Sequence, residues 1–218
     1  MNEPIYHVHE IFHSLKGEGK WTGTPMRFIR LHGCNLKCDF CDTDFSQDKP
    51  MTAQAIMDEL LKLPWTPRIV ITGGEPCMQP IEYLCQVLQG SELFIHLETN
   101  GMFEPPQTCD WVALSPKNLK LNTMALKMAD EIKFVFDENT PQFINEFTNK
   151  YHRFSMIDLD CQYYVMPKAL GVSNNDLDVD VRGPSGLNQK NITAAINYCK
   201  ENSGFSLCMQ LHKVLNIP

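Results

Sequence analysis

The fold is decided by the stretch Met26-Arg27-Phe28-Ile29-Arg30-Leu31-His32-Gly33-Cys34-Asn35-Leu36-Lys37-Cys38-Asp39-Phe40-Cys41. Residues 26–31 form a short, largely apolar run, which predicts a strand that ends at His32-Gly33. The residues that follow place three cysteines in a C-x3-C-x2-C pattern. A strand that leads directly into a loop of potential ligands indicates a site at the carboxyl end of a parallel sheet.

Beyond this stretch the chain alternates between strand and helix patterns. We expect further strands at 68–72, 93–97, 111–114, 131–136, 163–166 and 205–211, and helices at 52–63, 80–88, 141–149 and 188–201. Such alternation predicts right-handed βαβ units around a parallel sheet. A complete eight-unit barrel needs about 250 residues, whereas this chain has 218. We therefore expect an α/β fold, either a partial barrel or an open sheet, as a single domain over 1–218. Its crossover helices between 111–114 and 131–136, and after 163–166, should be short or missing.

Composition excludes several classes of protein. Lys and Arg total 19 against 26 Asp and Glu, a net charge of −7, which argues against non-specific binding to nucleic acid or to an anionic membrane. No apolar run approaches the ~18 residues of a spanning helix, and no export signal is visible at the N-terminus. We expect a cytoplasmic protein with reduced thiols. Six of the nine cysteines are then packing residues: Cys77, Cys85, Cys109, Cys161, Cys199 and Cys208.

The other three, Cys34, Cys38 and Cys41, form the C-x3-C-x2-C cluster. Three thiolates on one loop can hold three irons of a [4Fe–4S] cluster and leave the fourth iron open. Electron-transfer ferredoxins use four cysteines, whereas a site that binds a substrate keeps an open position. A zinc site, with His32 or a distant cysteine as fourth ligand, is the alternative, and three unrelated core cysteines are another.

The loops after the strands carry a family resemblance. The cysteine pattern, with Phe40 before its last member, resembles the signature of the radical S-adenosylmethionine (SAM) enzymes. Residues 72–76, Thr-Gly-Gly-Glu-Pro, resemble the GGEP motif of that superfamily, which follows the second strand. The resemblance implies a partial (β/α)6-type barrel, and a [4Fe–4S] cluster whose open iron is chelated by SAM.

A more specific resemblance covers nearly the whole chain. Residues 11–19, Ile-Phe-His-Ser-Leu-Lys-Gly-Glu-Gly, are similar to the opening motif of the 7-carboxy-7-deazaguanine synthase family. The segments Cys-Asp-Thr-Asp-Phe at 41–45, Glu-Thr-Asn-Gly at 98–101, Ser-Pro-Lys at 115–117 and Gln-Leu-His-Lys at 210–213 also match that family.

This resemblance implies a carbon–nitrogen lyase of queuosine and 7-deazapurine biosynthesis, a tRNA modification pathway. The family converts 6-carboxy-5,6,7,8-tetrahydropterin to 7-carboxy-7-deazaguanine with loss of ammonia. A 5′-deoxyadenosyl radical takes the C6 hydrogen and later returns it, so SAM is regenerated, and the reaction uses Mg2+. The resemblance further implies a homodimer and a reducing partner such as flavodoxin or ferredoxin, with no contact to nucleic acid or membrane.

The resemblance also assigns residues to roles, although none as a general acid or base. Thr43 offers a hard oxygen to Mg2+, and Arg30 offers a bidentate fork to the substrate carboxylate. The cluster is assigned to Cys34, Cys38 and Cys41. Substrate contacts are assigned to Leu15, Lys16, Gly17, Glu18, Arg30, Thr72, His212 and the carboxylate of Pro218. SAM contacts are assigned to Phe40, Asp42, Gly74, Glu75, Ser115, Pro116 and Lys117.

Two positions depart from the family pattern. Lys16 stands where the family usually has Gln, so a side-chain amide contact to the substrate would be lost while a backbone contact survives. Met166 replaces a common Gln, which removes a cofactor hydrogen bond. Two other functions stay open from sequence: an activating enzyme for a glycyl-radical protein, which shares the cluster and GGEP motifs, and a non-catalytic iron–sulfur or zinc protein.

Overall fold

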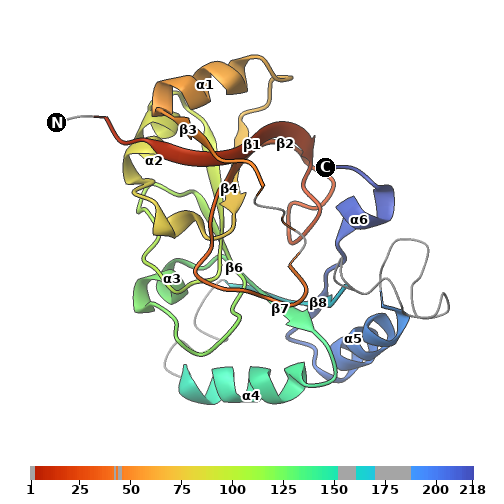
Figure 1. Ribbon diagram of the computed structural model, residues 1–218. Helices are drawn as coiled ribbons and strands as arrows, with labels where there is room; N and C mark the ends of the chain where they lie inside the picture. The colour runs from red at the N-terminus through yellow and green to blue at the C-terminus, as the bar shows by residue number, and fades with distance from the viewer. Residues whose placement is uncertain (1–2, 42, 44–45, 152–160, 170–187) are drawn as a thin grey trace.

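Nine strands form one sheet in the order β3-β1-β2-β4-β5-β6-β7-β8-β9 in the computed structural model (Figure 1). The structure describes residues 3–41, 43, 46–151, 161–169 and 188–218. The strands are β1 (Tyr6–Leu15), β2 (Pro25–Leu31), β3 (Lys49–Met51), β4 (Arg68–Gly73), β5 (Phe94–Thr99), β6 (Trp111–Leu114), β7 (Glu131–Phe136), β8 (Gln162–Pro167) and β9 (Ser206–Leu207). The helices are α1 (Ala53–Leu61), α2 (Glu82–Gly90), α3 (Thr123–Met128), α4 (Thr140–Lys150), α5 (Gln189–Glu201) and α6 (Leu211–Leu215), with a 3-10 turn, η1, at Pro76–Met78.

From β2 to β9 every neighbouring pair of strands is parallel, whereas β1 pairs antiparallel with β2 and with β3. The register pairs Arg30 with Thr72 and Leu31 with Gly73. The cysteine loop after β2 and the glycine turn after β4 therefore start side by side. This arrangement confirms the expected α/β fold with a mostly parallel sheet.

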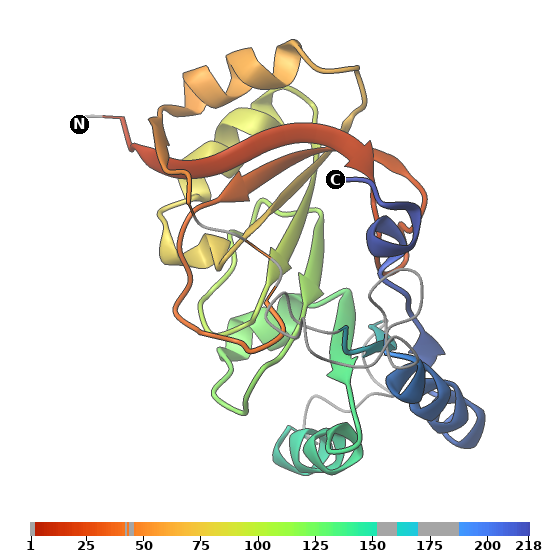
Figure 2. The same ribbon diagram turned by 45° about the vertical axis from the view of Figure 1, so that its right-hand side comes forward.

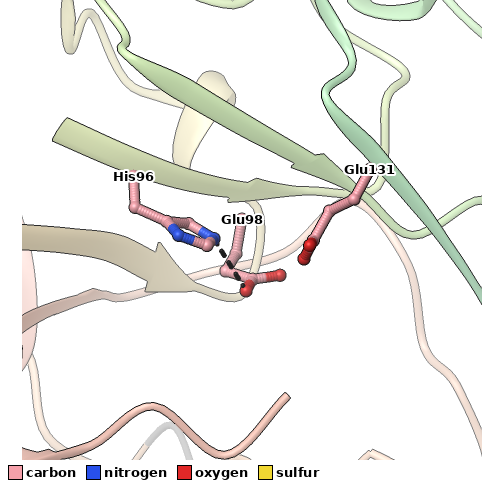
Figure 3. A group of neighbouring side chains, drawn as sticks. All are labelled: His96, Glu98 and Glu131. Carbon is pink, nitrogen blue, oxygen red and sulfur yellow. Dashed lines mark hydrogen bonds and ion pairs between the residues drawn. The ribbon is translucent and has the colours of Figure 1, made fainter. Parts of the chain in front are cut away.

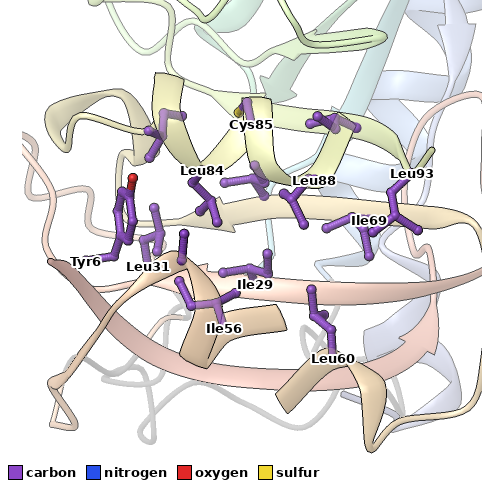
Figure 4. Close-up of a cluster of buried hydrophobic side chains, with 14 of the residues drawn as sticks. Tyr6, Ile29, Leu31, Ile56, Leu60, Ile69, Leu84, Cys85, Leu88 and Leu93 are labelled. Carbon is purple, nitrogen blue, oxygen red and sulfur yellow. The ribbon is translucent and has the colours of Figure 1, made fainter. Parts of the chain in front are cut away.

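Alternation along the strands separates a helix-covered face from an open face. On β2, Ile29 and Leu31 belong to the first hydrophobic core, packed with Ile56 and Leu60 of α1 and with Leu84 of α2 (Figure 4). A second core lies where α4 and α5 contact β7 and β8. Both cores lie along the same sheet, and a single domain over 1–218 stays a prediction. No helix in the described part of the chain is long and apolar enough to cross a bilayer.

Side-chain caps explain where several helices begin. Thr52 Oγ1 accepts a hydrogen bond from the Ala55 N–H at 3.1 Å at the start of α1. Asn122 and Asn188 cap α3 and α5 in the same way. These caps satisfy N–H groups that a first helical turn leaves without partners.

Three expectations about elements differ from the structure. The first strand of our predicted series begins at residue 26, yet β1 precedes it and is the longest strand in the described part of the chain. The predicted strand over 205–211 is wrong, since only Ser206–Leu207 pair with β8 and a helix starts at Leu211. Gly90 was expected to close the predicted helix at 80–88 as a C-terminal glycine, but it is the last residue of α2, and the positive φ lies at Glu92. The short crossover before β7 is confirmed by α3, whereas most of the chain between β8 and α5 lies outside the described residues.

Candidate active site

A cavity of about 620 Å³ opens at the carboxyl ends of the parallel strands. Its volume is in the range of small-molecule sites. Figure 2 shows α6 and the C-terminal segment beside the connection between β1 and β2, where Leu211 donates its N–H to the Gly17 carbonyl at 2.9 Å. Sixteen sequence-predicted site residues line the cavity: Leu15, Lys16, Gly17, Glu18, Arg30, Cys34, Cys38, Phe40, Cys41, Thr43, Thr72, Gly74, Ser115, Lys117, His212 and Pro218.

Three predicted residues are not among those that line it. Asp42 lies outside the described residues. Pro116 is buried between Ser115 and Lys117. Glu75 is 1 % exposed, and its carboxylate accepts hydrogen bonds from Thr99 Oγ1 at 2.7 Å, the Asn100 N–H at 2.7 Å and the Cys77 N–H at 3.1 Å. The Glu75 side chain therefore fastens the glycine turn to the end of β5 instead of pointing at the cavity.

The cysteine loop and the glycine turn are packed backbone against backbone. The Glu75 N–H donates to the Gly33 carbonyl at 3.0 Å. A Cβ on Gly74 would lie 2.0 Å from the Gly33 oxygen and 2.8 Å from the Cys34 Cβ. Gly73 has φ +140°, and its Cβ would lie 2.2 Å from the Leu31 carbonyl oxygen. Glycines are therefore required here because any side chain would push the two loops apart.

The thiols of Cys34, Cys38 and Cys41 all face the cavity and form no disulfide. Burial first, and then the nearby Glu75 and Cys41, raise the pKa of the Cys34 thiol. Burial also raises the pKa of Cys38, against the lowering effect of Lys117. Cysteine binds iron as the thiolate, so these thiols would release their protons when a cluster binds. Their type and their placement on one loop fit an iron–sulfur cluster.

The Gly-Glu-Gly segment at 17–19 presents Glu18 to the cavity. A Cβ on Gly17 would lie 2.2 Å from Nδ1 of His212, so the imidazole ring packs directly on the backbone. Gly19 has φ +70°, its Cβ would lie 2.1 Å from Oε1 of Glu131, and its N–H donates to Cys208 Sγ at 3.1 Å. Both glycines thus permit close packing that holds Glu18 between two fixed contacts.

Arg30 lies on the open face of β2, beside a pair of aromatic rings. Phe12 and Phe28 line the cavity and stack with their ring centroids 4.8 Å apart, and the Arg30 guanidinium lies 5.4 Å from the Phe12 centroid. Arg30 Nε forms an ion pair with Glu10 Oε1 at 2.8 Å, and its Nη1 donates to Thr43 Oγ1 at 3.4 Å. This wall offers a cation and flat apolar surface to one ligand.

Phe40 covers the cysteine loop between two lysines. Lys117 Nζ and Lys168 Nζ lie 5.5 Å and 5.1 Å from its ring centroid. Lys168 also pairs with Asp39 of the cysteine loop at 3.0 Å, and Lys117 donates to Ser115 Oγ at 2.5 Å. Lys168 follows a predicted strand but was given no role from the sequence; in the structure it ties this loop to the end of β8.

His96, Glu98 and Glu131 place potential ligand atoms within 4.8 Å of one another inside the sheet (Figure 3). We do not interpret these three residues as a metal site, because Glu98 already forms ion pairs with Lys16 Nζ at 2.7 Å and with Lys133 Nζ at 2.7 Å. A further divalent cation would be repelled by both. Sequence reasoning missed Lys133, although a lysine between apolar residues in the strand Glu-Ile-Lys-Phe-Val-Phe was a usable signal.

The fold and the cysteine cavity together define a radical SAM enzyme. In agreement, a family model described as the radical SAM superfamily matches residues 28–122. That family implies a [4Fe–4S] cluster and SAM as cofactors, and the three cavity thiols fit the cluster.

Full-length comparisons then specify the family. The 7-carboxy-7-deazaguanine synthase of Haemophilus influenzae is 31 % identical over 219 residues, covering 99 % of this chain and 95 % of the relative. The enzyme of Burkholderia multivorans, which carries the same name, is 32 % identical, covering 98 % and 99 %. The crystal structure of QueE from Escherichia coli superposes with a TM-score of 0.75 at 24 % identity over 95 % of each chain, which supports the fold. This chain belongs to the 7-carboxy-7-deazaguanine synthase family.

Proposed function

We propose that the protein converts 6-carboxy-5,6,7,8-tetrahydropterin to 7-carboxy-7-deazaguanine and ammonia, as the resemblance implies. The observation that carries this proposal is that Arg30, Glu18 and the loop of Cys34, Cys38 and Cys41 all line the same cavity. An activating enzyme for a glycyl-radical protein would not need these two side chains inside a small-molecule cavity. A non-catalytic metal protein would need neither them nor the glycine turn.

The substrate requirements match the cavity walls. Arg30 provides a fork for the pterin carboxylate, and the face formed by Phe12 and Phe28 provides apolar surface against the flat ring. Glu18 is an acceptor for the amino and imino N–H groups of the pterin. His212 packs on Gly17 next to Glu18 and also lines the cavity. These contacts orient C6 of the pterin towards the cysteine loop.

The cofactors would be held by the loops at the other end of the cavity. Cys34, Cys38 and Cys41 would ligate the cluster, and the Gly73-Gly74 backbone, Phe40, Ser115 and Lys117 would contact SAM. When bound, these cofactors supply the one-electron chemistry that activates the C6–H bond. The protein contributes orientation and exclusion of competing hydrogen donors. Ring contraction with loss of ammonia leaves the overall oxidation state unchanged, so the hydrogen can return and SAM need not be consumed.

Magnesium would bind through Thr43, with the remaining ligands from the substrate and water. Thr43 lines the cavity next to Arg30. Mg2+ is commonly held by few protein ligands and keeps several waters. This arrangement would place the ion at the substrate carboxylate.

Replacing Thr43 with Ala should raise the Mg2+ concentration needed for half-maximal activity by about tenfold, because one inner ligand is lost. Thr43→Ser, which keeps the hydroxyl, should stay near the wild-type value. Iron content and the cluster absorption spectrum should be the same in all three proteins. An unaltered Mg2+ dependence in Thr43→Ala would exclude this ligand.

A reductant and a second subunit also belong to the proposal. Cys41 is exposed at the cavity rim, so a flavodoxin or ferredoxin could deliver an electron over a short distance there. A homodimer is expected from the family resemblance.

The function is tested by an anaerobic reaction of the cluster-reconstituted protein with SAM, Mg2+, dithionite and 6-carboxytetrahydropterin. We expect 7-carboxy-7-deazaguanine and ammonia in equal amounts, detected by mass spectrometry and an ammonia assay. Cleavage of SAM without the deazaguanine, from protein with a full cluster, would overturn the assignment.

A further inference from the structure

A buried lysine directly supports the carboxylate that faces the substrate. Lys133 lies on the open face of β7, with only 1 % of its side chain exposed. Its ammonium group contacts Glu18 Oε2 at 2.8 Å and Glu98 Oε2 at 2.7 Å. The other oxygen of Glu18 accepts a hydrogen bond from Gln210 Nε2 at 3.0 Å. Both oxygens of Glu18 are thus anchored to the protein, and the lone pairs that remain are available to a ligand.

A second lysine completes the arrangement through Glu98. Lys16 Nζ contacts Glu98 Oε1 at 2.7 Å, and its side chain is 5 % exposed. Since its ammonium is held by Glu98, Lys16 does not take the place of the amide found in relatives of the family. It acts on the site through Glu98 instead.

The two buried lysines hold two buried carboxylates in their ionised form. Burial acts first and raises the pKa of Glu18, but Lys133 and Lys16 outweigh it and lower that pKa to about 2. Burial also raises the pKa of Glu98, but the same two lysines outweigh the effect of burial and lower that pKa. Burial lowers the pKa of His96 to about 4, which leaves the ring neutral. Burial raises the pKa of Glu131, whose Oε1 has no hydrogen-bond partner. The ammonium groups of Lys133 and Lys16 therefore contact the ionised carboxylates of Glu18 and Glu98, and the carboxyl group of Glu131 also lies near Lys133.

Such buried ion pairs are costly to form, and they contribute little net stability when they replace apolar residues. Removing one partner, in contrast, leaves the other charge buried without compensation. These buried ion pairs lie on a cavity wall, so we attribute them to their effect on Glu18, which lines the cavity.

We propose that Lys133 is a positioning residue, which holds Glu18 ionised and oriented to accept hydrogen bonds from the amino and imino groups of the pterin, with Lys16 and Glu98 completing the charge balance. The proposal rests on the proposed function. The charged or titratable groups around Glu18 include Lys16, Glu98, Lys117, Lys133 and Cys208, and the imidazole of His212 packs on the adjacent Gly17.

The test compares wild-type protein, Lys133→Met and Lys133→Arg, each with a full cluster and bound SAM, under anaerobic conditions. Lys133→Met should raise the KM for 6-carboxytetrahydropterin by about 30-fold with a smaller change in kcat. Lys133→Arg, which keeps the cation, should recover most of this loss. Lys20→Met, a control on a lysine that stacks on Trp111 away from the cavity, should keep the wild-type KM.

The pH dependence separates charge from packing. Without its cation, Glu18 should titrate at a higher pH, so the affinity of Lys133→Met relative to wild type should fall further as the pH is lowered from 8 to about 5. Taking the ratio cancels the ionisation of the pterin itself. A ratio that is flat with pH, or an equal KM increase in Lys133→Arg, would overturn the proposal.

A second variant keeps the proposal testable if Lys133→Met does not fold. Lys16→Gln removes the other cation but leaves the contact between Lys133 and Glu18, so it should shift the pH dependence in the same direction by a smaller amount. A wild-type pH dependence in Lys16→Gln would then contradict the proposed charge balance. Wild-type protein that neither binds nor converts the pterin would instead contradict the proposed function.

Discussion

Cys38→Ala should lose the absorption of the iron–sulfur cluster and reduce deazaguanine formation to the background rate. Cys38 is the middle thiol of the cavity loop, and both of its neighbours in the pattern face the same cavity. Two thiolates cannot hold three irons of the cluster, so the loss removes the group that supplies the chemistry. Iron analysis, the visible spectrum and the anaerobic assay measure the result.

The matched control is Cys199→Ala. Cys199 lies in α5, packed against the second hydrophobic core and away from the cavity. This variant should bind the same amount of iron as the wild type and keep its activity. Full iron and activity in Cys38→Ala, or equal losses in both variants, would place the cluster elsewhere.

Arg30→Met should raise the KM for 6-carboxytetrahydropterin by about 100-fold while iron content stays normal. Loss of a charged, bidentate partner for a carboxylate typically costs this much affinity. Arg30→Lys keeps the positive charge but loses the bidentate guanidinium, so its KM should lie between those of the wild type and Arg30→Met. Arg68→Met is the control, because Arg68 stacks on Trp21 at the opposite end of β4 and does not line the cavity.

An analogue sharpens this second prediction. Wild-type protein should bind tetrahydropterin without the carboxylate much more weakly than the substrate. Arg30→Met should bind the two compounds almost equally, because the group that distinguishes them has gone. If the variant keeps the wild-type discrimination, another residue reads the carboxylate.

Much of the fold could be predicted from local patterns. The strands at 111–114 and 131–136 and the helix after Asn188 are bounded by apolar runs and side-chain caps that act within a few residues. The strand β1 is harder to predict because most of its residues are only partly buried and show no clear alternation of apolar and polar side chains. The predicted strand over 205–211 is too long, because only Ser206–Leu207 pair with β8 and a short helix begins at Leu211.

Site residues could be predicted where they lie close together in the sequence. They were missed where the sheet brings together residues that are far apart in the sequence. The cysteine loop and the Gly-Glu-Gly segment are each formed by a few consecutive residues. Lys133 lies 115 residues from Glu18, and only the sheet brings them into contact. The Glu75 side chain gives another example: its carboxylate joins the glycine turn to the end of β5, a contact that the motif alone does not predict.

The most direct test of the proposed reaction uses 6-carboxytetrahydropterin deuterated at C6, with limiting SAM and the reconstituted protein. The account predicts many molecules of 7-carboxy-7-deazaguanine per molecule of SAM, together with deuterium in the SAM that is recovered. Stoichiometric loss of SAM with no deazaguanine and no transfer of deuterium would contradict it.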